Sequence, residues 1–513
     1  MSSVSQDRKR YLSKNHVLSK NTTKLETMLI RQSKNSFIRI YDDGLLGYIT
    51  NQLTRHDRSY NESGADFLAQ ISREPKSIDD IVNNLKKIYD IDTETIRNDF
   101  IEFAQDLAEH KFIVIGETAA DLDNQDLDFS YSMENPKTLI DDFTQNTKEE
   151  PDKTTQDYLL QHDREKPRLA GLQFELTSRC NERCIHCYIP NGKKNTGFDL
   201  TFDQFKFIID QFVDMGGIHV ILSGGEALLN KDITKILCYC REKDLQISLL
   251  TNLISLTDQQ ISVIKDVNVS IIQVSLYSMN PEIHDTITTV KGSWQRTKDA
   301  IEKLHKAEIP VQISCPVMKA NKDGYADVMS YAQGMRMKST TDYIMMAQAD
   351  LNTCNLANRL SLKETEQVIQ DIIDYDRDYL EETLKLEPYS SIPEEEFAEM
   401  PLCGAGINSL CVTVNGDIYP CAGWQAFVVG NVFKQSLKEI WEKSPKLAEI
   451  RKVKRKDFPK CLTCDARDYC AMCLVRNFNE SGGDMFKTNQ HFCDVAFLNK
   501  RLVEEFKENT SCK

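Results

Sequence analysis

The 513-residue sequence has no run of eighteen apolar residues, so it predicts no membrane-spanning helix. Its polar beginning lacks the apolar segment of a secretory signal peptide. It also lacks a surplus of basic residues, because 63 Lys and Arg stand against 78 Asp and Glu. A net charge of −15 repels a phosphate backbone. We therefore expect a cytoplasmic protein whose partners include neither a membrane nor nucleic acid.

Cysteine, in contrast, is plentiful, with 16 residues in the chain. Disulfides are rare in a reducing compartment, so clustered cysteines there favour metal ligands or catalytic groups. One cluster has the spacing C-x3-C-x2-C and comprises Cys180, Cys184 and Cys187. A second, C-terminal cluster comprises Cys403, Cys421, Cys461, Cys464, Cys470, Cys473 and Cys493.

Composition and periodicity divide the chain into five stretches. Residues 1–34 are polar and predict an arm, and residues 35–117 follow the order strand–strand–helix–helix–strand, typical of a small winged-helix domain. Residues 118–168 lack periodicity and predict a linker. In residues 169–400, six strand-length apolar runs alternate with helical patterns, which predicts an α/β fold with a partial (β/α)6 TIM-like barrel. Residues 401–513 are rich in cysteine and end in an amphipathic helix.

The barrel places the first cysteine cluster at its functional end, because the loops that follow the strands of such barrels hold the active site. The first predicted strand, 171–178, leads directly into that cluster, and the sixth is predicted at 341–348. The residues that end the second, third and fourth strands are Gly224, Gly225 and Glu226, then Asn252, then Ser275.

Both cysteine clusters allow a zinc interpretation from spacing alone. Structural zinc takes four protein ligands, so the first cluster needs one more, for which His186 is available. A chance group of thiols is the remaining alternative. In the second cluster, the run C-x2-C-x5-C-x2-C between residues 461 and 473 fits a four-cysteine zinc ribbon.

The sequence "CNERCIHCY", followed by "SGGEALL", resembles the radical S-adenosylmethionine (radical SAM) superfamily. The resemblance implies that Cys180, Cys184 and Cys187 hold a [4Fe–4S] cluster whose open iron binds S-adenosyl-L-methionine (SAM). It implies a set of further SAM contacts at Gly224, Gly225, Glu226, Asn252 and Ser275. Relatives often carry an arginine near position 288 for the SAM carboxylate; this chain has Thr288 there, which leaves Lys291 or Arg296 as substitutes.

The C-terminal pattern resembles the SPASM extension of radical SAM enzymes, which binds two auxiliary [4Fe–4S] clusters. By family pattern, Cys403, Cys421 and Cys473 hold the first auxiliary cluster. The second set is Cys461, Cys464, Cys470 and Cys493. The first set is one ligand short, which leaves either an open iron or Cys411; its place in "LCVTV" favours a buried strand residue.

Residues 35–117 resemble the recognition element of enzymes that modify ribosomally made peptides (RiPPs). That element binds the leader of a precursor peptide by adding it as a strand to a sheet edge. A DNA-binding wing is the alternative, and the acidic helices "SIDDIV" and "DTETIRNDFIEF" argue against it. The resemblance implies two partners: the precursor peptide and an electron donor of flavodoxin or ferredoxin type.

Together these features resemble a radical SAM–SPASM peptide maturase. The implied reaction is hydrogen abstraction by a 5′-deoxyadenosyl radical, followed by an intramolecular cross-link, with a thioether as the first expectation. The alternatives are a carbon–carbon or carbon–oxygen cross-link and formylglycine formation of the sulfatase-maturing type. The non-enzymatic alternative is a zinc-stabilised peptide-binding scaffold.

Overall fold

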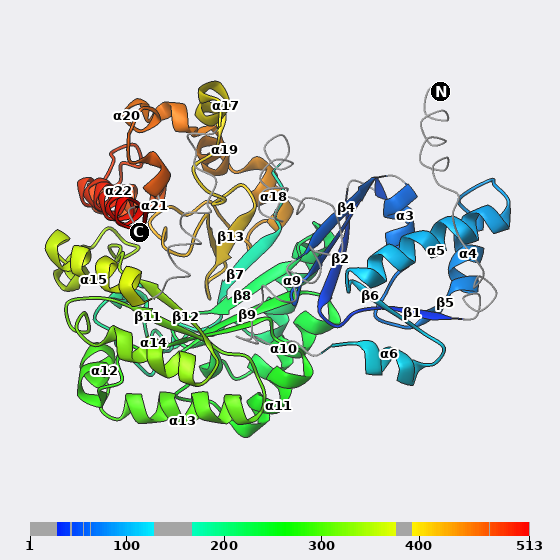
Figure 1. The fold of residues 1–513 in the computed structure, drawn as a ribbon, viewed down its shortest axis with the longest axis horizontal. Coiled ribbons are helices and arrows are strands. Elements are labelled where there is room, and N and C mark those ends of the chain that lie inside the picture. Colours follow the sequence, from blue (N-terminus) through cyan, green and yellow to red (C-terminus); the bar gives the residue numbers. More distant parts are fainter. Residues whose placement is uncertain are drawn as a thin grey trace. The chain divides into compact units, whose positions relative to one another are not determined.

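The computed structural model of the chain describes residues 28–41, 44–54, 56–61, 63–127, 167–375, 392–470 and 472–511. These residues form two compact units (Figure 1). The first contains the N-terminal part together with two short segments, Gly216–Ile218 and Arg241–Gln246, and the second contains the rest. No helix among the described residues has the length and apolar character needed to cross a membrane.

The first unit is built on two antiparallel three-stranded sheets. One has the order β5-β1-β6, with β1 (Leu29–Gln32), β5 (Lys76–Ser77) and β6 (Ile113–Gly116). The other has the order β2-β3-β4, with β2 (Ser36–Tyr41), β3 (Leu46–Asn51) and β4 (Asp57–Asn61). The helices are α3 (Ser63–Ala69), α4 (Ile78–Lys86), α5 (Thr93–Glu109) and α6 (Ala119–Gln125).

Local sequence signals explain the two central helices of this unit. Ser77 caps α4 by accepting a hydrogen bond from the Asp80 amide, and Asp92 caps α5 in the same way through Thr95. The apolar stripes of both helices enter one core, where Val82 and Phe100 are fully buried. The predicted hairpin, helices and closing strand are therefore confirmed.

Five elements of this unit were not expected from the sequence: β1, β4, β5, α3 and α6. Strand β4, "DRSYN", is polar and half-exposed, so it lacks the apolar alternation of a strand. Strand β1 lies inside the predicted arm and pairs with β6, and α6 lies inside the predicted linker. The rest of the arm (1–27) and of the linker (128–166) lies outside the described residues.

The second unit contains six parallel strands that neighbour one another in sequence order, which confirms the predicted β/α repeat. They are β7 (Gly171–Glu175), β8 (His219–Ser223), β9 (Gln246–Thr251), β10 (Ile271–Ser275), β11 (Gln312–Pro316) and β12 (Lys338–Asp342). The intervening helices are α9 (Phe202–Asp214), α10 (Ile233–Glu242), α11 (Asp258–Asp266), α12 (Pro281–Thr288), α13 (Ser293–Lys306) and α14 (Tyr325–Gly334).

Two features of this sheet differ from the prediction. The sixth strand is the polar segment "KSTTD", and most of the apolar run expected to form it, 341–348, follows the strand instead. The sheet also continues past β7 into β13 (Ser409–Val412), β14 (Asp417–Tyr419) and β15 (Gly430–Asn431). Strand β13 pairs in parallel with β7, so the predicted boundary at residue 400 separates segments that share one sheet.

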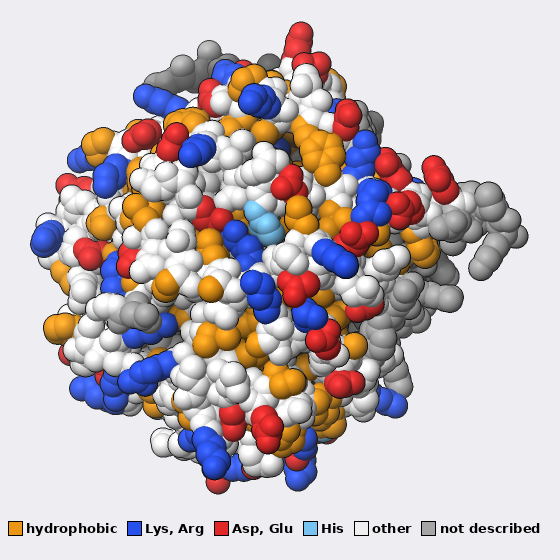
Figure 2. All heavy atoms as spheres, turned by 90° about the vertical axis from the view of Figure 1, so that its left-hand side faces the viewer, with side chains coloured by type: hydrophobic (Ala, Val, Ile, Leu, Met, Phe, Trp, Pro, Cys, Tyr) orange, Lys and Arg blue, Asp and Glu red, His pale blue; other side chains and the backbone are white. Residues whose placement is uncertain are grey.

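The cysteine-rich region contains a hairpin of β13 and β14, in which Gly416 has φ +78° between the two strands. Its helices are α17 (Glu394–Glu399), α18 (Leu437–Lys443), α19 (Pro445–Lys452), α20 (Pro459–Leu462), α21 (Leu474–Ser481) and α22 (Gln490–Ser511). Helix α22 confirms the predicted C-terminal helix. The face shown in Figure 2 carries interspersed basic and acidic side chains with apolar patches between them.

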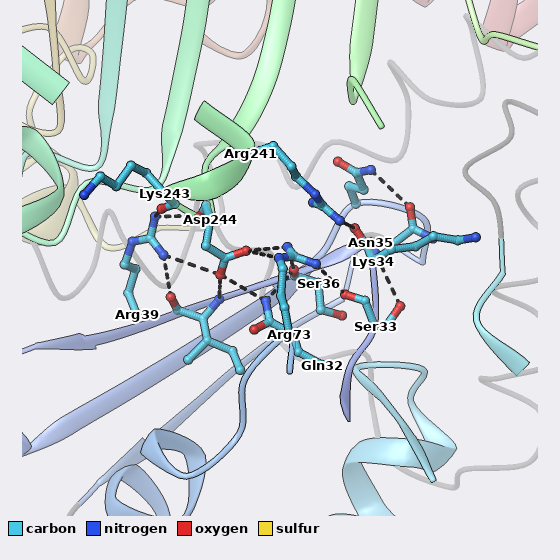
Figure 3. Close-up of polar contacts among 12 residues, drawn as sticks. Gln32, Ser33, Lys34, Asn35, Ser36, Arg39, Arg73, Arg241, Lys243 and Asp244 are labelled. Atoms are coloured by element: carbon cyan, nitrogen blue, oxygen red, sulfur yellow. Dashed lines mark hydrogen bonds and ion pairs between the residues drawn. The ribbon is translucent and has the colours of Figure 1, made fainter. Parts of the chain in front are cut away.

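Within the first unit, the two short segments contact the β2 region through buried polar groups (Figure 3). The Arg39 guanidinium donates hydrogen bonds to the carbonyls of Gly217 and Asp244, each at 2.7 Å. The Asp244 carboxylate accepts hydrogen bonds from Arg73 Nε at 2.6 Å and from Gln32 Nε2 at 3.0 Å. This network ties the start of β2 to the turn that leads into β9.

Candidate functional site

The first cysteine loop starts directly after β7 and is held against the end of β8 by backbone hydrogen bonds. The amide of Gly225 donates to the Thr177 carbonyl, and the amide of Glu226 donates to the Arg179 carbonyl, each at 2.8 Å. The Arg179 side chain in turn donates to Asp199 at 3.0 Å. The segment that carries Cys180 is therefore held by backbone hydrogen bonds to the end of β8 and by the Arg179 side chain to Asp199.

The two glycines before Glu226 allow this close approach. A Cβ at Gly224 would lie 2.7 Å from the Thr177 carbonyl oxygen, and Gly224 also has φ +139°. A Cβ at Gly225 would lie 2.6 Å from the Arg179 carbonyl carbon and 3.0 Å from Cys180 Cβ. The two glycines therefore admit the backbone of the cysteine loop, while their contact with SAM stays a prediction.

The Glu226 carboxylate turns into the protein, where its side chain is 2% exposed. It accepts hydrogen bonds from the Thr251 hydroxyl at 2.6 Å and from the Asn252 amide at 2.7 Å, which joins the ends of β8 and β9. The Asn252 side chain donates to Asn181 Oδ1 at 2.7 Å, within the cysteine loop. The structure thus brings two predicted SAM contacts together with the loop, while their direct contact with SAM stays a prediction.

Ser275 reaches the cysteine loop through a tyrosine that the sequence analysis missed. The Ser275 side chain acts to lower the pKa of Tyr277, which burial raises, and the Tyr277 hydroxyl donates to Cys184 Sγ at 3.8 Å. The ring of His186 packs edge-on against Tyr277, with centroids 5.0 Å apart. Burial lowers the pKa of His186 to about 4, so this ring is neutral at ordinary pH.

The three thiols of the loop act on one another electrostatically. Burial raises the pKa of Cys180 to about 12, and the charge of Cys187 contributes to the rise. Burial likewise raises the pKa of Cys184, with contributions from Glu182, Cys187 and Cys180. Thiolate is the form that binds metal, so loading this site has to displace protons. Three neighbouring thiols on one loop fit the donor set of an iron–sulfur cluster.

Glu182, between the first two cysteines, is a further buried acid at this site. Its side chain is 4% exposed, and Cys184 Sγ donates to its Oε2 at 3.3 Å. Burial raises the pKa of Glu182 to about 7, and the charge of Arg296 opposes the rise. Arg296 therefore lies within electrostatic range of the cysteine loop, as its predicted role toward the SAM carboxylate requires. Lys291 is exposed, and its role stays a prediction.

The pKa shifts of two C-terminal cysteines involve thiols of the same implied set. Burial raises the pKa of Cys403 to about 11, and the charges of Cys473 and Cys421 add to the rise. The pKa of Cys470 is also raised to about 11, by burial and by the charges of its own set: Cys493, Cys461 and Cys464. The structure thus brings the members of each set close together. Their assignment as cluster ligands stays a prediction.

The C-terminal thiols lie on or next to several different helices and strands. Cys421 follows β14, Cys461 lies on α20, Cys473 precedes α21, and Cys493 lies in the first turn of α22. Cys411 lies fully buried on β13, where it packs with Tyr419, Ala422 and Tyr188. Among the described residues, no group of three or more His, Cys, Asp and Glu side chains is arranged to hold a single metal ion.

Glu175, at the end of β7, is a second acid that the sequence analysis missed. Its carboxylate is 8% exposed and accepts a hydrogen bond from Gln425 Nε2. Burial raises its pKa to about 7, opposed by the charge of Lys193. The charges of Glu175, Cys187 and Cys421 all act on the Tyr188 hydroxyl. A carboxyl that can hold or release a proton near neutral pH therefore lies close to both cysteine regions.

Three family models match the chain. The radical SAM superfamily model matches residues 174–332, and the model of the SPASM iron–sulfur cluster-binding domain matches residues 403–465. The model of coenzyme PQQ synthesis protein D (PqqD) matches residues 56–113. These ranges contain the first cysteine loop, part of the second cluster, and the part of the first unit from β4 to α5, respectively.

Individual relatives are distant but cover long stretches. An AdoMet-dependent heme synthase of Methanosarcina barkeri is 26% identical over 333 residues, 62% of this chain and 93% of the relative. The subtilosin biosynthesis protein AlbA of Bacillus subtilis is 27% identical over 315 residues, 60% of this chain and 68% of AlbA. The structure of Streptococcus suis SuiB bound to precursor peptide SuiA superposes with a TM-score of 0.61 at 17% identity, covering 90% of this chain and 99% of SuiB.

Proposed function

The chain belongs to the radical SAM enzymes that carry a SPASM domain and a PqqD-type domain, and from this premise we propose that it cross-links a ribosomally made precursor peptide. The combination of the three matched domains in one chain carries the proposal. AlbA acts in the biosynthesis of a bacteriocin, and SuiB has been captured with its precursor peptide, which supports a peptide substrate for this chain.

The cofactors are SAM with one [4Fe–4S] cluster, and auxiliary iron–sulfur clusters in the SPASM domain. We assign the SAM-binding cluster to Cys180, Cys184 and Cys187, and two auxiliary [4Fe–4S] clusters to the two C-terminal sets. When bound, the first cluster supplies an electron that cleaves SAM to methionine and a 5′-deoxyadenosyl radical. The residues around it hold the loop: Glu226 and Asn252 join two strand ends to Asn181, and Tyr277 supports Cys184.

Cross-linking removes two hydrogens from the peptide for each bond formed. One leaves as a hydrogen atom to the 5′-deoxyadenosyl radical, and the other leaves as a proton and an electron. Glu175 is the side chain that we assign to receive the proton, because it is a buried carboxyl beside Gln425 and close to Tyr188. The electron would pass to one of the auxiliary iron–sulfur clusters.

A thioether between a peptide cysteine and a second residue is the cross-link that we propose first. A carbon–carbon or carbon–oxygen bond forms with the same loss of two hydrogens, so this mass change supports cross-linking but does not identify the type of bond. The test is the mass of the precursor peptide after anaerobic incubation with SAM and a reductant. Loss of two hydrogens per link supports the proposal, and unchanged peptide mass contradicts it.

We further propose that the PqqD-type domain binds the leader of the precursor as an added strand on β4, an outer strand of its sheet. The Asn51 amide donates to the His56 carbonyl at 2.9 Å, and bonded pairs alternate along an antiparallel ladder. The pair Tyr48–Ser59 is therefore a non-bonded pair, and the Ser59 N–H points away from β3. This N–H is available to a strand added at the outer edge.

Ser59→Pro is expected to weaken binding of the precursor about tenfold, because proline removes that outward donor without removing a bond to β3. Ser59→Ala keeps the donor and is the matched control. Fluorescence anisotropy with labelled precursor measures the affinity, and SAM cleavage without peptide should be equal in both variants. Equal peptide affinity of the two variants would count against β4 as the binding edge. Point variants are preferable to domain deletion, which would also remove the Arg39 and Arg73 contacts to Asp244.

The electron donor is a partner that we place in the flavodoxin or ferredoxin class, in a reducing compartment such as the cytoplasm. The abundance of free thiols among the described cysteines supports that compartment.

A further inference from the structure

A strongly basic segment lies within the cysteine-rich region. Residues 443–460 contain eight Lys and Arg against two Asp and Glu, a net charge of +6 in a chain of net charge −15. The segment spans the end of α18, all of α19 and the beginning of α20, and it ends next to Cys461. A concentration of positive charge with exposed lysines suggests a partner with the opposite charge.

Five lysines of this segment are exposed, and we call them the basic face: Lys443, Lys446, Lys452, Lys456 and Lys460. Two have acidic neighbours, because Lys443 lies 3.8 Å from Glu439 and Lys456 lies 2.7 Å from Glu399. For the other three, the described residues provide no ion pair; Lys446 instead lies 4.9 Å from the ring centre of Phe427. A lysine without an ion-pair partner in the protein has no such contact to break before it binds an external partner.

Beside the basic face lies a hollow of about 540 Å³ lined by Pro445, Ala448, Glu449, Lys452, Val453, Asp457 and Phe486. Its largest apolar side chain, Phe486, is 47% exposed and stacks on Phe458 with ring centres 5.7 Å apart. Phe458 is buried, and its carbonyl accepts the Cys461 amide at 2.8 Å. The exposed Phe486 is thus connected through Phe458 to Cys461, the first cysteine of the second auxiliary set.

We propose that the basic face and this hollow dock an acidic one-electron carrier protein of the flavodoxin or ferredoxin class, beside the cluster site of Cys461, Cys464, Cys470 and Cys493. The proposal rests on the proposed function, because it needs a redox cluster at that site. The exchange moves one electron and no atom: the site is oxidised as the carrier is reduced, or the reverse. Charge steering with a small apolar centre is typical of electron-transfer partners, whose interfaces are small and transient.

The test compares two triple variants with the same change in charge. K446E/K452E/K460E reverses the unpaired lysines of the basic face. K303E/K306E/K363E reverses three exposed lysines on α13 and at the start of α15 (Leu362–Tyr375), away from this segment in sequence. The probe is a purified acidic flavodoxin. Its affinity for the cluster-loaded enzyme is measured by calorimetry, and the rate of flavin semiquinone formation by absorbance, both without peptide.

The basic-face variant is expected to bind flavodoxin at least about tenfold more weakly at low salt, with a smaller difference at high salt because exposed charges are screened. SAM cleavage driven by dithionite should equal that of the control variant, because dithionite needs no docking. Equal flavodoxin affinity of the two variants overturns the proposal, as does a parallel loss of dithionite-driven cleavage. Neither readout needs a peptide product, so failure of the docking proposal is distinguishable from failure of the cross-linking proposal.

Discussion

Replacing Cys180, Cys184 and Cys187 together by alanine is expected to abolish reductive cleavage of SAM. The triple variant loses every thiol of the loop that follows β7, so no ligands remain for the cluster whose open iron would bind SAM. The loss should be complete rather than partial, because the remaining residues of the loop provide only the buried Glu182 and the neutral His186. The measurement is anaerobic production of 5′-deoxyadenosine with dithionite.

The same variant makes a quantitative prediction about iron. Three [4Fe–4S] clusters correspond to about twelve iron atoms per chain, and the triple variant should retain about eight. Cys238→Ala, an exposed thiol on α10 outside both clusters, is the matched control and should retain all of them. Retained SAM cleavage in the triple variant would sink the assignment of the SAM cluster. A colourless wild-type protein with stoichiometric zinc would favour the peptide-binding scaffold instead.

Gly225→Ala is expected to lower the rate of SAM cleavage by about a hundredfold although it changes no polar group. The added Cβ would lie 2.6 Å from the Arg179 carbonyl carbon and 3.0 Å from Cys180 Cβ. Backbone atoms cannot rotate away as a flexible side chain can, so the cysteine loop has to move. A displacement of about 1 Å in a reacting constellation costs on the order of a hundredfold in rate.

Gly334→Ala is the matched control for this prediction. Gly334 ends α14, and an added Cβ there would meet no atom within 4 Å. Both variants should keep the circular dichroism spectrum of the wild type, while only Gly225→Ala should lose SAM cleavage and alter the electron paramagnetic resonance signal of the reduced cluster. Wild-type cleavage by Gly225→Ala would show that the loop tolerates the displacement and would refute the packing role of this glycine.

The sequence could predict the features that depend on local spacing. The cysteine loop is eight residues long, and its position after β7 follows from one apolar run, so its place at the end of the barrel was predictable. The six parallel strands follow from alternating apolar and helical patterns. The grouping of the C-terminal thiols came from a resemblance, and the electrostatic coupling of Cys403 with Cys473 and of Cys470 with Cys493 agrees with it.

Other features depend on contacts between residues far apart in the chain. Gln425 donates to Glu175 across 250 positions, and β13 pairs with β7 across a similar separation, so no local pattern reveals either contact. Glu226 accepts hydrogen bonds from Thr251 and Asn252, and its sequence motif reveals neither contact. The polar strands β4 and β12 lack the apolar alternation that marks a strand.

The mass of the precursor peptide tests the central claim most directly. A candidate precursor peptide is incubated anaerobically with the cluster-loaded enzyme, SAM and dithionite, and its mass is recorded with tandem fragmentation. The proposed cross-linking predicts a loss of two hydrogens per link, missing fragments between the linked residues and no aldehyde. Oxidation of serine to formylglycine also removes two hydrogens, but it yields an aldehyde that reacts with a hydrazide probe. An aldehyde product, or an unchanged peptide mass while SAM is cleaved, would contradict the account.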